Sequence, residues 1–352
     1  MNKPLASQAP VCVTGASGFI ASRLVADLLQ QGYRVRGTVR DASQAAKYSF
    51  LTELPGATDR LELVSADLLA PESFEDAVAG CEYVMHTASP YVLTAKDPDK
   101  ELVQPALRGT EGVLAACAKV GGVKRVVLTS SVAALTDEPQ PGEVLTEEDW
   151  NEKSSLTRNP YYFSKVKAER AAWKFMEDQS PDFDLVVINP FMVYGPSLSK
   201  AINTSNQVFI DLLTGVFPGI INISWSLVDV RDVAQAHILA METPTASGRH
   251  LCAHNTIGMR ELVALLAELG YRNYKLPKLS LDNGFGNLLV RLASLFQPAG
   301  VRSYLKTNLN RVPNFDNSKI KSELGLEFRD FESSLSDTIL DLIQWKHIPD
   351  IT

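Results

Sequence analysis

Residues 11–29, VCVTGASGFIASRLVADLL, decide the fold of this chain. Residues 11–14 are a short β-branched run, Gly15 and Gly18 are turn residues, and residues 19–31 carry apolar side chains at helical spacing. The pattern predicts a strand, a tight turn and a helix. Glycines let the backbone approach a pyrophosphate closely, and the positive end of the helix dipole favours its negative charge, so we expect a dinucleotide to bind here.

The spacing of the turn is G-x-x-G-x-x-A, with Ala21 in the third position, where helix and strand must pack closely. It differs from the more common G-x-G-x-x-G pattern, so the glycines alone are weak evidence. The alternative is that Gly15 and Gly18 only turn the chain. The remaining sequence has to decide between these two interpretations.

The composition is that of a globular protein. The chain has 352 residues, of which 45% are hydrophobic and 21% charged, with a net charge of −7 and a pI near 5.4. An acidic chain without a basic run argues against nucleic acid and against an anionic membrane as partners. We therefore expect a small-molecule substrate as the partner, and a monomer or a homodimer.

No targeting or membrane-spanning segment is predicted. The first ten residues, MNKPLASQAP, lack the apolar core of a signal peptide, and no stretch approaches the about 20 apolar residues that span a bilayer. Cys12, Cys81, Cys117 and Cys252 are far apart and have no C-x-x-C spacing, which predicts reduced, buried thiols. These features predict a cytoplasmic protein.

Strands alternate with helices after the first unit, an order that requires right-handed parallel crossovers and predicts a doubly wound α/β sheet, the Rossmann fold. We predict that residues 1–195 are mainly the dinucleotide-binding domain and that residues 196–352 are mainly a smaller substrate-binding lobe, with some segments returning to the first domain. The polar stretch 137–159 is predicted to be a surface excursion. The predicted strands are 33–39, 61–65, 83–87, 125–129, 184–188, 227–230 and 250–253, and the predicted helices are 73–79, 100–120, 161–178, 208–213, 231–242, 259–269, 285–296 and 331–345.

The end of the second predicted strand indicates which cofactor is bound. NAD enzymes place an Asp or Glu there to hold the ribose 2′-OH, whereas an Arg accommodates a 2′-phosphate. Here the residue is Arg40, with Arg36 upstream, Asp41 following and Lys47 in the next segment. This favours NADPH over NADH. The alternative is that these cations form an ordinary solvated face.

Ser130 and Ser131 follow the fifth predicted strand, at the sheet edge where ligands bind in this architecture. Tyr161 and Lys165 are four residues apart on one predicted helix, so the phenol and the ammonium share a face. Lowering a phenol's pKa from about 10 to about 7 needs about 4 kcal/mol, which one cation at about 4 Å can supply at an effective dielectric constant of about 20. Tyr161 is therefore a candidate acid or base. Alternatively, it is a surface aromatic beside a lysine.

Four motifs together resemble the extended short-chain dehydrogenase/reductase family: TGASGFIA at 14–21, TVRD at 38–41, TSS at 129–131 and YYFSK at 161–165. Within this family the chain is similar to the group of dihydroflavonol reductase, cinnamoyl-CoA reductase and yeast methylglyoxal reductase, closely up to Pro196 and loosely afterwards. The resemblance implies an NADPH-dependent carbonyl reductase.

By this resemblance, Ser131, Tyr161 and Lys165 form the catalytic triad. Ser131 is the second serine of TSS, which matches the family's residue, and Tyr161 is preferred to Tyr162 because only Tyr161 has a lysine four residues later. The implied cofactor-binding residues are Gly15, Ser17, Gly18, Phe19, Ile20, Arg40, Lys47, Asp67, Leu68, Thr87, Ala88, Ser89, Tyr161, Lys165, Pro190, Val193 and Ser205.

The expected substrate pocket is broad and apolar. Thr136 stands where plant flavonoid reductases carry an Asn that recognises ring hydroxyls, so we expect hydrophobic or aryl ketones and keto esters rather than dihydroflavonols. No metal is expected, because His250, Cys252 and His254 alternate along a strand-like run without a further ligand cluster. The predicted substrate-binding residues are Tyr91, Ser131, Thr136, Tyr161, Phe191, Met192 and Trp225.

Two other functions are open at this point. A nucleotide-sugar epimerase or dehydratase uses the same triad, but dehydratases of the family place Thr-Asp-Glu beside the serine. Here Thr136-Asp137-Glu138 lies five residues too far along. A non-catalytic NADP-binding sensor on the same fold commonly lacks the Tyr/Lys pair, which this chain has. Oxidation of NADPH in the presence of aryl ketones distinguishes the three.

Overall fold

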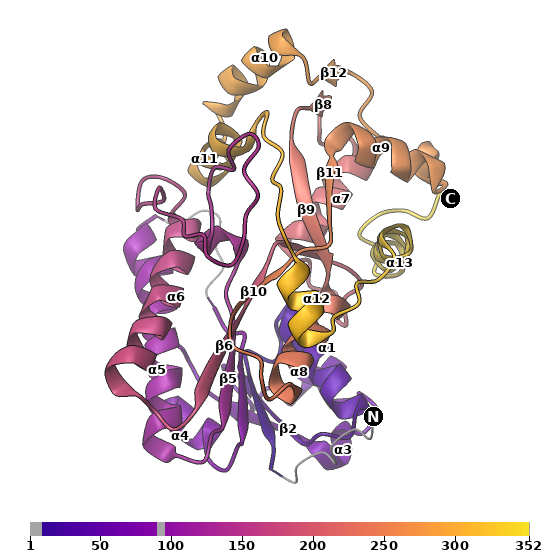
Figure 1. The fold of residues 1–352 in the computed structure, drawn as a ribbon. Coiled ribbons are helices and arrows are strands. Elements are labelled where there is room, and N and C mark those ends of the chain that lie inside the picture. The colour runs from indigo at the N-terminus through magenta and orange to yellow at the C-terminus, as the bar shows by residue number, and fades with distance from the viewer. Residues whose placement is uncertain (1–8, 90–95, 352) are drawn as a thin grey trace.

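Seven parallel strands form the central sheet, in the order β10-β6-β5-β4-β1-β2-β3 (Figure 1). The structure is a computed structural model that describes residues 9–89 and 96–351. The strand order reverses between β1 and β4, and this switch point is where open α/β sheets bind ligands. The predicted doubly wound fold is confirmed. The strands are β1 (Val11–Thr14), β2 (Val35–Val39), β3 (Leu61–Ser65), β4 (Tyr83–His86), β5 (Arg125–Thr129), β6 (Asp184–Pro190) and β10 (Gly248–Cys252).

Helices cover both faces of this sheet (Figure 1). α1 and α8 pack together on one face, whereas α5 packs between α4 and α6 on the other. The apolar spacing of α1 explains its place, because Leu24, Val25, Leu28 and Leu29 are all buried against the sheet. The helices of these two layers are α1 (Phe19–Gln30), α4 (Ser73–Val78), α5 (Gln104–Val120), α6 (Pro160–Gln179), α8 (Val230–Glu242) and α12 (Ser318–Leu324), with short turns η1 (Ala45–Tyr48), α2 (Ser49–Thr52), α3 (Ala57–Arg60) and η3 (Val132–Ala134).

A second, smaller sheet arises in the C-terminal half. β9 pairs in parallel with β7 and antiparallel with β11, and the short strand β8 pairs with β12. β10 comes from the same half of the chain but joins the large sheet, and α8 and α12 pack against that sheet. The remaining elements are β7 (Met192–Tyr194), β8 (Ile220–Ile221), β9 (Ser224–Asp229), β11 (Asn255–Gly258), β12 (Ser280–Leu281), α7 (Thr204–Thr214), α9 (Met259–Glu268), η4 (Tyr271–Asn273), α10 (Gly284–Ser294), α11 (Ala299–Asn308) and α13 (Phe331–Gln344).

Two expectations about local structure need correction. The helix predicted over 100–120 begins with a π-helical turn, η2 (Asp99–Val103), because Pro105 has no N–H to donate to the carbonyl of Glu101, four residues earlier. The stretch 137–159 is not a simple surface excursion, since Asp137, Asn151 and Asn159 are buried within it. Among the described residues, no helix is both long enough and apolar enough to cross a membrane.

Candidate active site

The glycine turn after β1 is held against the loop that follows β4. Gly15 has a φ of +66°, and a Cβ at this position would lie 3.1 Å from the Cβ of Ala88. Its N–H donates to the hydroxyl of Thr38 at 3.0 Å, and the N–H of Gly18 donates to its carbonyl at 2.8 Å. The turn therefore leaves Ser17 and Gly18 exposed at the N-terminus of α1, where a helix attracts phosphate.

Thr14 joins β1 to the loop after β4. Its hydroxyl accepts hydrogen bonds from the N–H groups of Thr87 and Ala88, at 3.1 and 3.0 Å, and lies 2.9 Å from Nδ1 of His86. Burial, together with the positive charge of Lys165, lowers the pKa of His86 to about 3. His86 is therefore a neutral structural residue that fixes the loop carrying the predicted contacts Thr87, Ala88 and Ser89.

The cations near the end of β2 have different roles. Arg36 binds Glu62 of β3 and the carbonyl of Ala79, both at 2.7 Å, so it ties strands and loops together. Arg40 is exposed at the end of β2, and Lys47 is exposed in η1 with its Nζ 5.7 Å from the centre of the Tyr48 ring. Of the three, Arg40 and Lys47 are exposed, so both stay candidates for the predicted contact with a 2′-phosphate.

Other predicted cofactor residues follow the carboxyl ends of the strands. Asp67 lies beyond β3, where its carboxylate accepts from the N–H of Leu69 at 2.9 Å, and Leu68 packs against Gly109 of α5. Phe19 and Ile20 begin α1 and are half-buried. Pro190 ends β6, Val193 lies in β7 and Ser205 lies in the first turn of α7.

Tyr161 and Lys165 share one face of α6, as the spacing predicts. Tyr161 lies in the first turn of the helix, and Nζ of Lys165 is 5.9 Å from the centre of its ring. Lys165 is 8% exposed, and burial lowers its pKa to about 8, with Glu169 acting in the opposite direction. A small pocket lined by Ala88, Ser89 and Lys165 connects this face to the loop after β4. The pair thus reaches the predicted cofactor edge of the sheet.

The two serines after β5 are in different environments. Ser130 is buried, and its hydroxyl donates to Oε2 of Glu169 at 2.5 Å. Ser131 is half-buried; its Oγ accepts from the N–H of Ala133 at 3.1 Å, which leaves its own O–H for another acceptor. This arrangement favours Ser131 as the serine that meets a substrate.

A buried ion pair supports the base of this site. Glu169 is fully buried one turn after Lys165, and its carboxylate accepts from Ser130, from Asn189 at 2.8 Å and from Nε of Arg249 at 2.6 Å. Asn189 also donates to the carbonyl of Ser131 at 3.3 Å. The sequence interpretation missed this group. In the sequence, Glu169 is visible only as a glutamate four residues after Lys165. Its partner Arg249 lies on β10, far along the chain, so no local pattern connects the two.

The sequence matches the NAD dependent epimerase/dehydratase family over residues 11–253, which is more than half of its length. The chain belongs to this family. It is 41% identical over 344 residues to cinnamoyl-CoA reductase CAD2 of Medicago truncatula, covering 96% of each chain. It is 38% identical over 343 residues to tetraketide alpha-pyrone reductase 1 of Arabidopsis thaliana, covering 95% of each chain. Among solved structures, it resembles yeast methylglyoxal/isovaleraldehyde reductase Gre2 complexed with NADPH, with a TM-score of 0.78 and 28% identity over 96% of this chain and 99% of the yeast chain.

These likenesses confirm that the chain is an extended short-chain dehydrogenase/reductase. At the level of class, it is an NAD(P)-dependent reductase of that family. The yeast structure contains NADPH, in agreement with the cofactor that Arg40 predicts.

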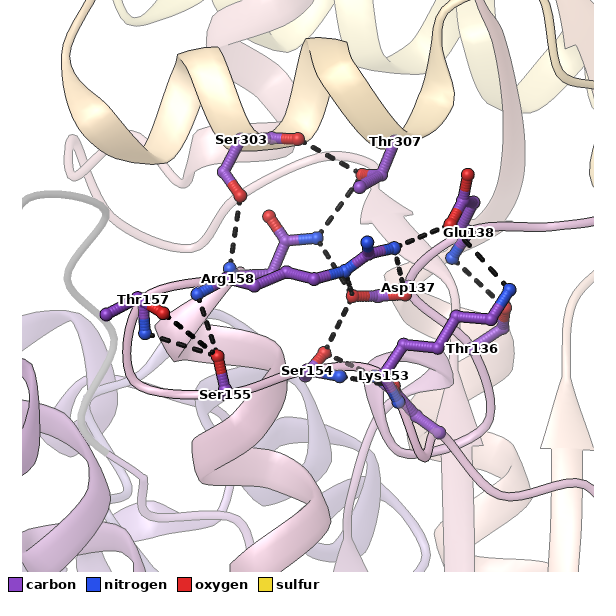
Figure 2. Close-up of polar contacts among 12 residues, drawn as sticks. Thr136, Asp137, Glu138, Lys153, Ser154, Ser155, Thr157, Arg158, Ser303 and Thr307 are labelled. Atoms are coloured by element: carbon purple, nitrogen blue, oxygen red, sulfur yellow. Dashed lines mark hydrogen bonds and ion pairs between the residues drawn. The ribbon is translucent and has the colours of Figure 1, made fainter.

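Thr136-Asp137-Glu138, whose position in the sequence argues against a dehydratase, lies in a network of ion pairs and hydrogen bonds (Figure 2). Asp137 is buried and accepts from Arg158 at 2.9 Å and from Ser154 at 3.1 Å. Glu138 binds Arg158 and Arg311, both at 2.6 Å, and Arg158 holds the pKa of Glu138 below its usual range. The carboxylates of Asp137 and Glu138 therefore both form structural ion pairs in this protein.

The same network fixes the start of α6. Asn159 precedes α6 in the left-handed conformation, with a φ of +49°, and lies two residues before Tyr161. Its N–H donates to the hydroxyl of Ser303 at 3.1 Å and its amide donates to Thr307 at 3.2 Å. Ser303 and Thr307 lie on α11 (Figure 2), so the C-terminal half of the chain holds the helix that carries Tyr161.

Not all of the predicted substrate-binding residues are exposed enough to line a substrate pocket. Phe191 is 8% exposed with its ring 5.2 Å from that of Phe315, and Trp225 is 6% exposed in the core of the smaller lobe. Met192 is half-buried, and the hydroxyl of Thr136 accepts from the N–H of Glu138 at 3.2 Å. Tyr91 lies outside the described residues.

The residues considered as metal ligands have other partners. His250 contacts Glu323 at 3.1 Å, and His254 stacks on Phe328 with ring centres 5.1 Å apart. Within residues 9–89 and 96–351, no three His, Cys, Asp or Glu side chains are grouped so that they could hold a metal ion. The four cysteines are free and buried.

Proposed function

We propose that this chain is an NADPH-dependent reductase that transfers hydride to the carbonyl of a hydrophobic ketone, aryl ketone, keto ester or aldehyde. The observation that carries the proposal is the Tyr161–Lys165 pair, with a buried ammonium beside the phenol at the dinucleotide edge of the sheet. The Medicago and Arabidopsis relatives are reductases by name, which supports the same class.

The turn at Gly15 and Gly18 fits a pyrophosphate, because the exposed N-terminus of α1 that follows it offers backbone N–H groups. The exposed guanidinium of Arg40 fits a 2′-phosphate. When bound, NADPH supplies the hydride that reduces the carbonyl carbon. Ser131 donates a hydrogen bond to the substrate oxygen, and Tyr161 gives that oxygen its proton. Lys165 holds the phenol's pKa down and binds the cofactor ribose.

An epimerase or dehydratase is the second candidate, since the family includes both. The observation against a dehydratase is the state of Asp137 and Glu138, whose carboxylates are bound by Arg158 and Arg311. A carboxylate held by arginine is a poor proton carrier, because the cation stabilises its charged form. A non-catalytic sensor does not need a buried lysine beside Tyr161, which is costly to maintain.

The proposal predicts how substrates rank. We expect kcat/KM for aryl ketones or keto esters to exceed that for dihydroflavonols by about tenfold or more, because Thr136 offers no amide for ring hydroxyls. NADPH oxidation with both substrate classes, at the same enzyme concentration, measures the ratio. A higher kcat/KM for dihydroflavonols contradicts the proposed pocket, and an absence of NADPH oxidation with every carbonyl contradicts the proposed function.

Cofactor preference is a separate prediction. Arg40→Ala should weaken NADPH binding by about 10- to 100-fold and leave NADH binding nearly unchanged, because a guanidinium forms charge-assisted hydrogen bonds to a 2′-phosphate. Fluorescence titrations of wild type and variant with both cofactors give the dissociation constants. Lys47→Ala is the comparison variant, because Lys47 is the other exposed cation of this segment, and it should reduce the preference for NADPH by less than Arg40→Ala does. The assignment fails if Lys47→Ala abolishes the preference and Arg40→Ala does not.

A further inference from the structure

The helix α10 presents its large apolar side chains to solvent. Phe285, Leu288 and Leu292 are 71%, 54% and 52% exposed, and Phe296 just after the helix is 91% exposed. Leu289 and Leu295 complete this outer face. Their spacing of three or four residues places them on one side of the helix. An apolar surface of this extent is rare on a protein that has no partner there.

The inner face of α10, which packs against the C-terminal half of the chain, consists of small residues. Gly286, Val290 and Ser294 recur every four residues and face inward, with Gly286 and Ser294 buried and Val290 packed against the core of the smaller lobe. A Cβ at Gly286 would lie 2.3 Å from the carbonyl oxygen of Leu281, so only glycine allows this approach. In a usual amphipathic helix the large apolar side chains face the core. In α10 the small residues face the core and the large apolar side chains face solvent.

The segment that carries α10 is positively charged, although the chain as a whole is acidic. Residues 275–312 contain six cations and a single acidic residue, Asp282, which is bound by Arg260 at 2.6 Å. Arg291, Arg302 and Lys306 are exposed on α10 and α11, and none of them forms an ion pair within the part of the chain that the structure describes. Figure 1 shows α10 at one end of the molecule, next to β12 and far from α4.

We propose that the outer face of α10 binds the surface of a membrane that contains anionic lipid. An interfacial helix inserts Phe and Leu among the acyl chains while Lys and Arg beside them bind the headgroup phosphates. The expectation against a membrane rested on the charge of the whole chain, whereas lipid recognition depends on the local charge. A second copy of this chain fits less well, because a two-fold contact brings two copies of the same positively charged segment together.

Vesicle co-sedimentation at low salt tests the proposal. Wild type should bind phosphatidylcholine–phosphatidylglycerol vesicles more tightly than vesicles of phosphatidylcholine alone, and added salt should weaken the binding. The triple variant Leu288→Gln/Leu292→Gln/Phe296→Gln should bind the mixed vesicles about tenfold or more weakly. Arg291→Gln/Arg302→Gln/Lys306→Gln should abolish the preference for phosphatidylglycerol.

The matched controls are Leu340→Gln, an exposed leucine on α13, and Lys119→Gln/Lys174→Gln, exposed lysines of the large domain. Circular dichroism should show that all variants are folded. The proposal is overturned if wild type ignores the mixed vesicles, or if the controls lose binding as much as the α10 variants. It is also overturned if light scattering shows a wild-type dimer that the α10 triple variant dissociates, or if that variant raises KM for a ketone without vesicles present.

Discussion

Replacing Tyr161 with phenylalanine is expected to lower kcat for carbonyl reduction by about 10²-fold or more, the usual contribution of a positioned proton donor. The Kd for NADPH should remain nearly unchanged, because the substitution removes one oxygen and keeps the ring. That ring lies edge-on to Tyr162, with centres 6.0 Å apart, so its packing is preserved. Steady-state turnover of an aryl ketone and a fluorescence titration with NADPH measure the two quantities separately.

Tyr162→Phe is the control, since Tyr162 is the next residue on α6 and has no lysine four residues later. It should retain most of the wild-type turnover. Wild-type turnover by Tyr161→Phe, with NADPH still bound, would require the triad and its mechanism to be abandoned.

Lys165→Met is expected to make the protein more stable and less active. The free energy of unfolding of the cofactor-free protein should rise by about 3 kcal/mol at neutral pH, because burial lowers the pKa of Lys165 from 10.5 to about 8 and each pKa unit corresponds to about 1.4 kcal/mol. The turnover should fall, since the substitution removes the cation proposed to lower the pKa of the Tyr161 phenol.

The pH dependence gives the sign of this effect. Below pH 8 the folded protein carries the buried charge and its full cost, whereas above pH 10.5 lysine is neutral in both folded and unfolded states. Wild type should therefore gain stability relative to Lys165→Met as the pH rises from about 8 to 10.5. Urea unfolding across this range measures the difference. Lys167→Met, an exposed lysine on the same helix, should show no such trend, and a Lys165→Met variant less stable than wild type at pH 7 would contradict the argument.

The parts of the fold that the sequence predicted well are those whose signals are local. The β-branched run of β1, the turn at Gly15 and Gly18 and the apolar face of α1 occupy fewer than 20 consecutive residues, and the structure has all three in place. Tyr161 and Lys165 share a face because an α-helix repeats every 3.6 residues, which is also a local property.

The rest depends on contacts between distant residues. Glu169 gave no sign of its role, because Arg249 lies 80 residues away in sequence. The polar, acidic stretch 137–159 predicts a surface excursion, but Arg158 and Arg311 bind Asp137 and Glu138 and allow Asp137 to be buried. For α10, the spacing of the apolar residues predicts a helix, but the sequence does not indicate that its large apolar face points to solvent.

The place of β10 has a consequence for synthesis on the ribosome. This strand pairs with β6 at the edge of the large sheet, and it carries Arg249, which binds the buried Glu169. When residues 1–195 have left the exit tunnel, the outer edge of β6 is still unpaired and Glu169 on α6 lacks its partner Arg249. The nascent domain therefore exposes the edge of β6 until about 60 further residues have been added. The large sheet is completed only by β10, the last of its strands to be synthesised.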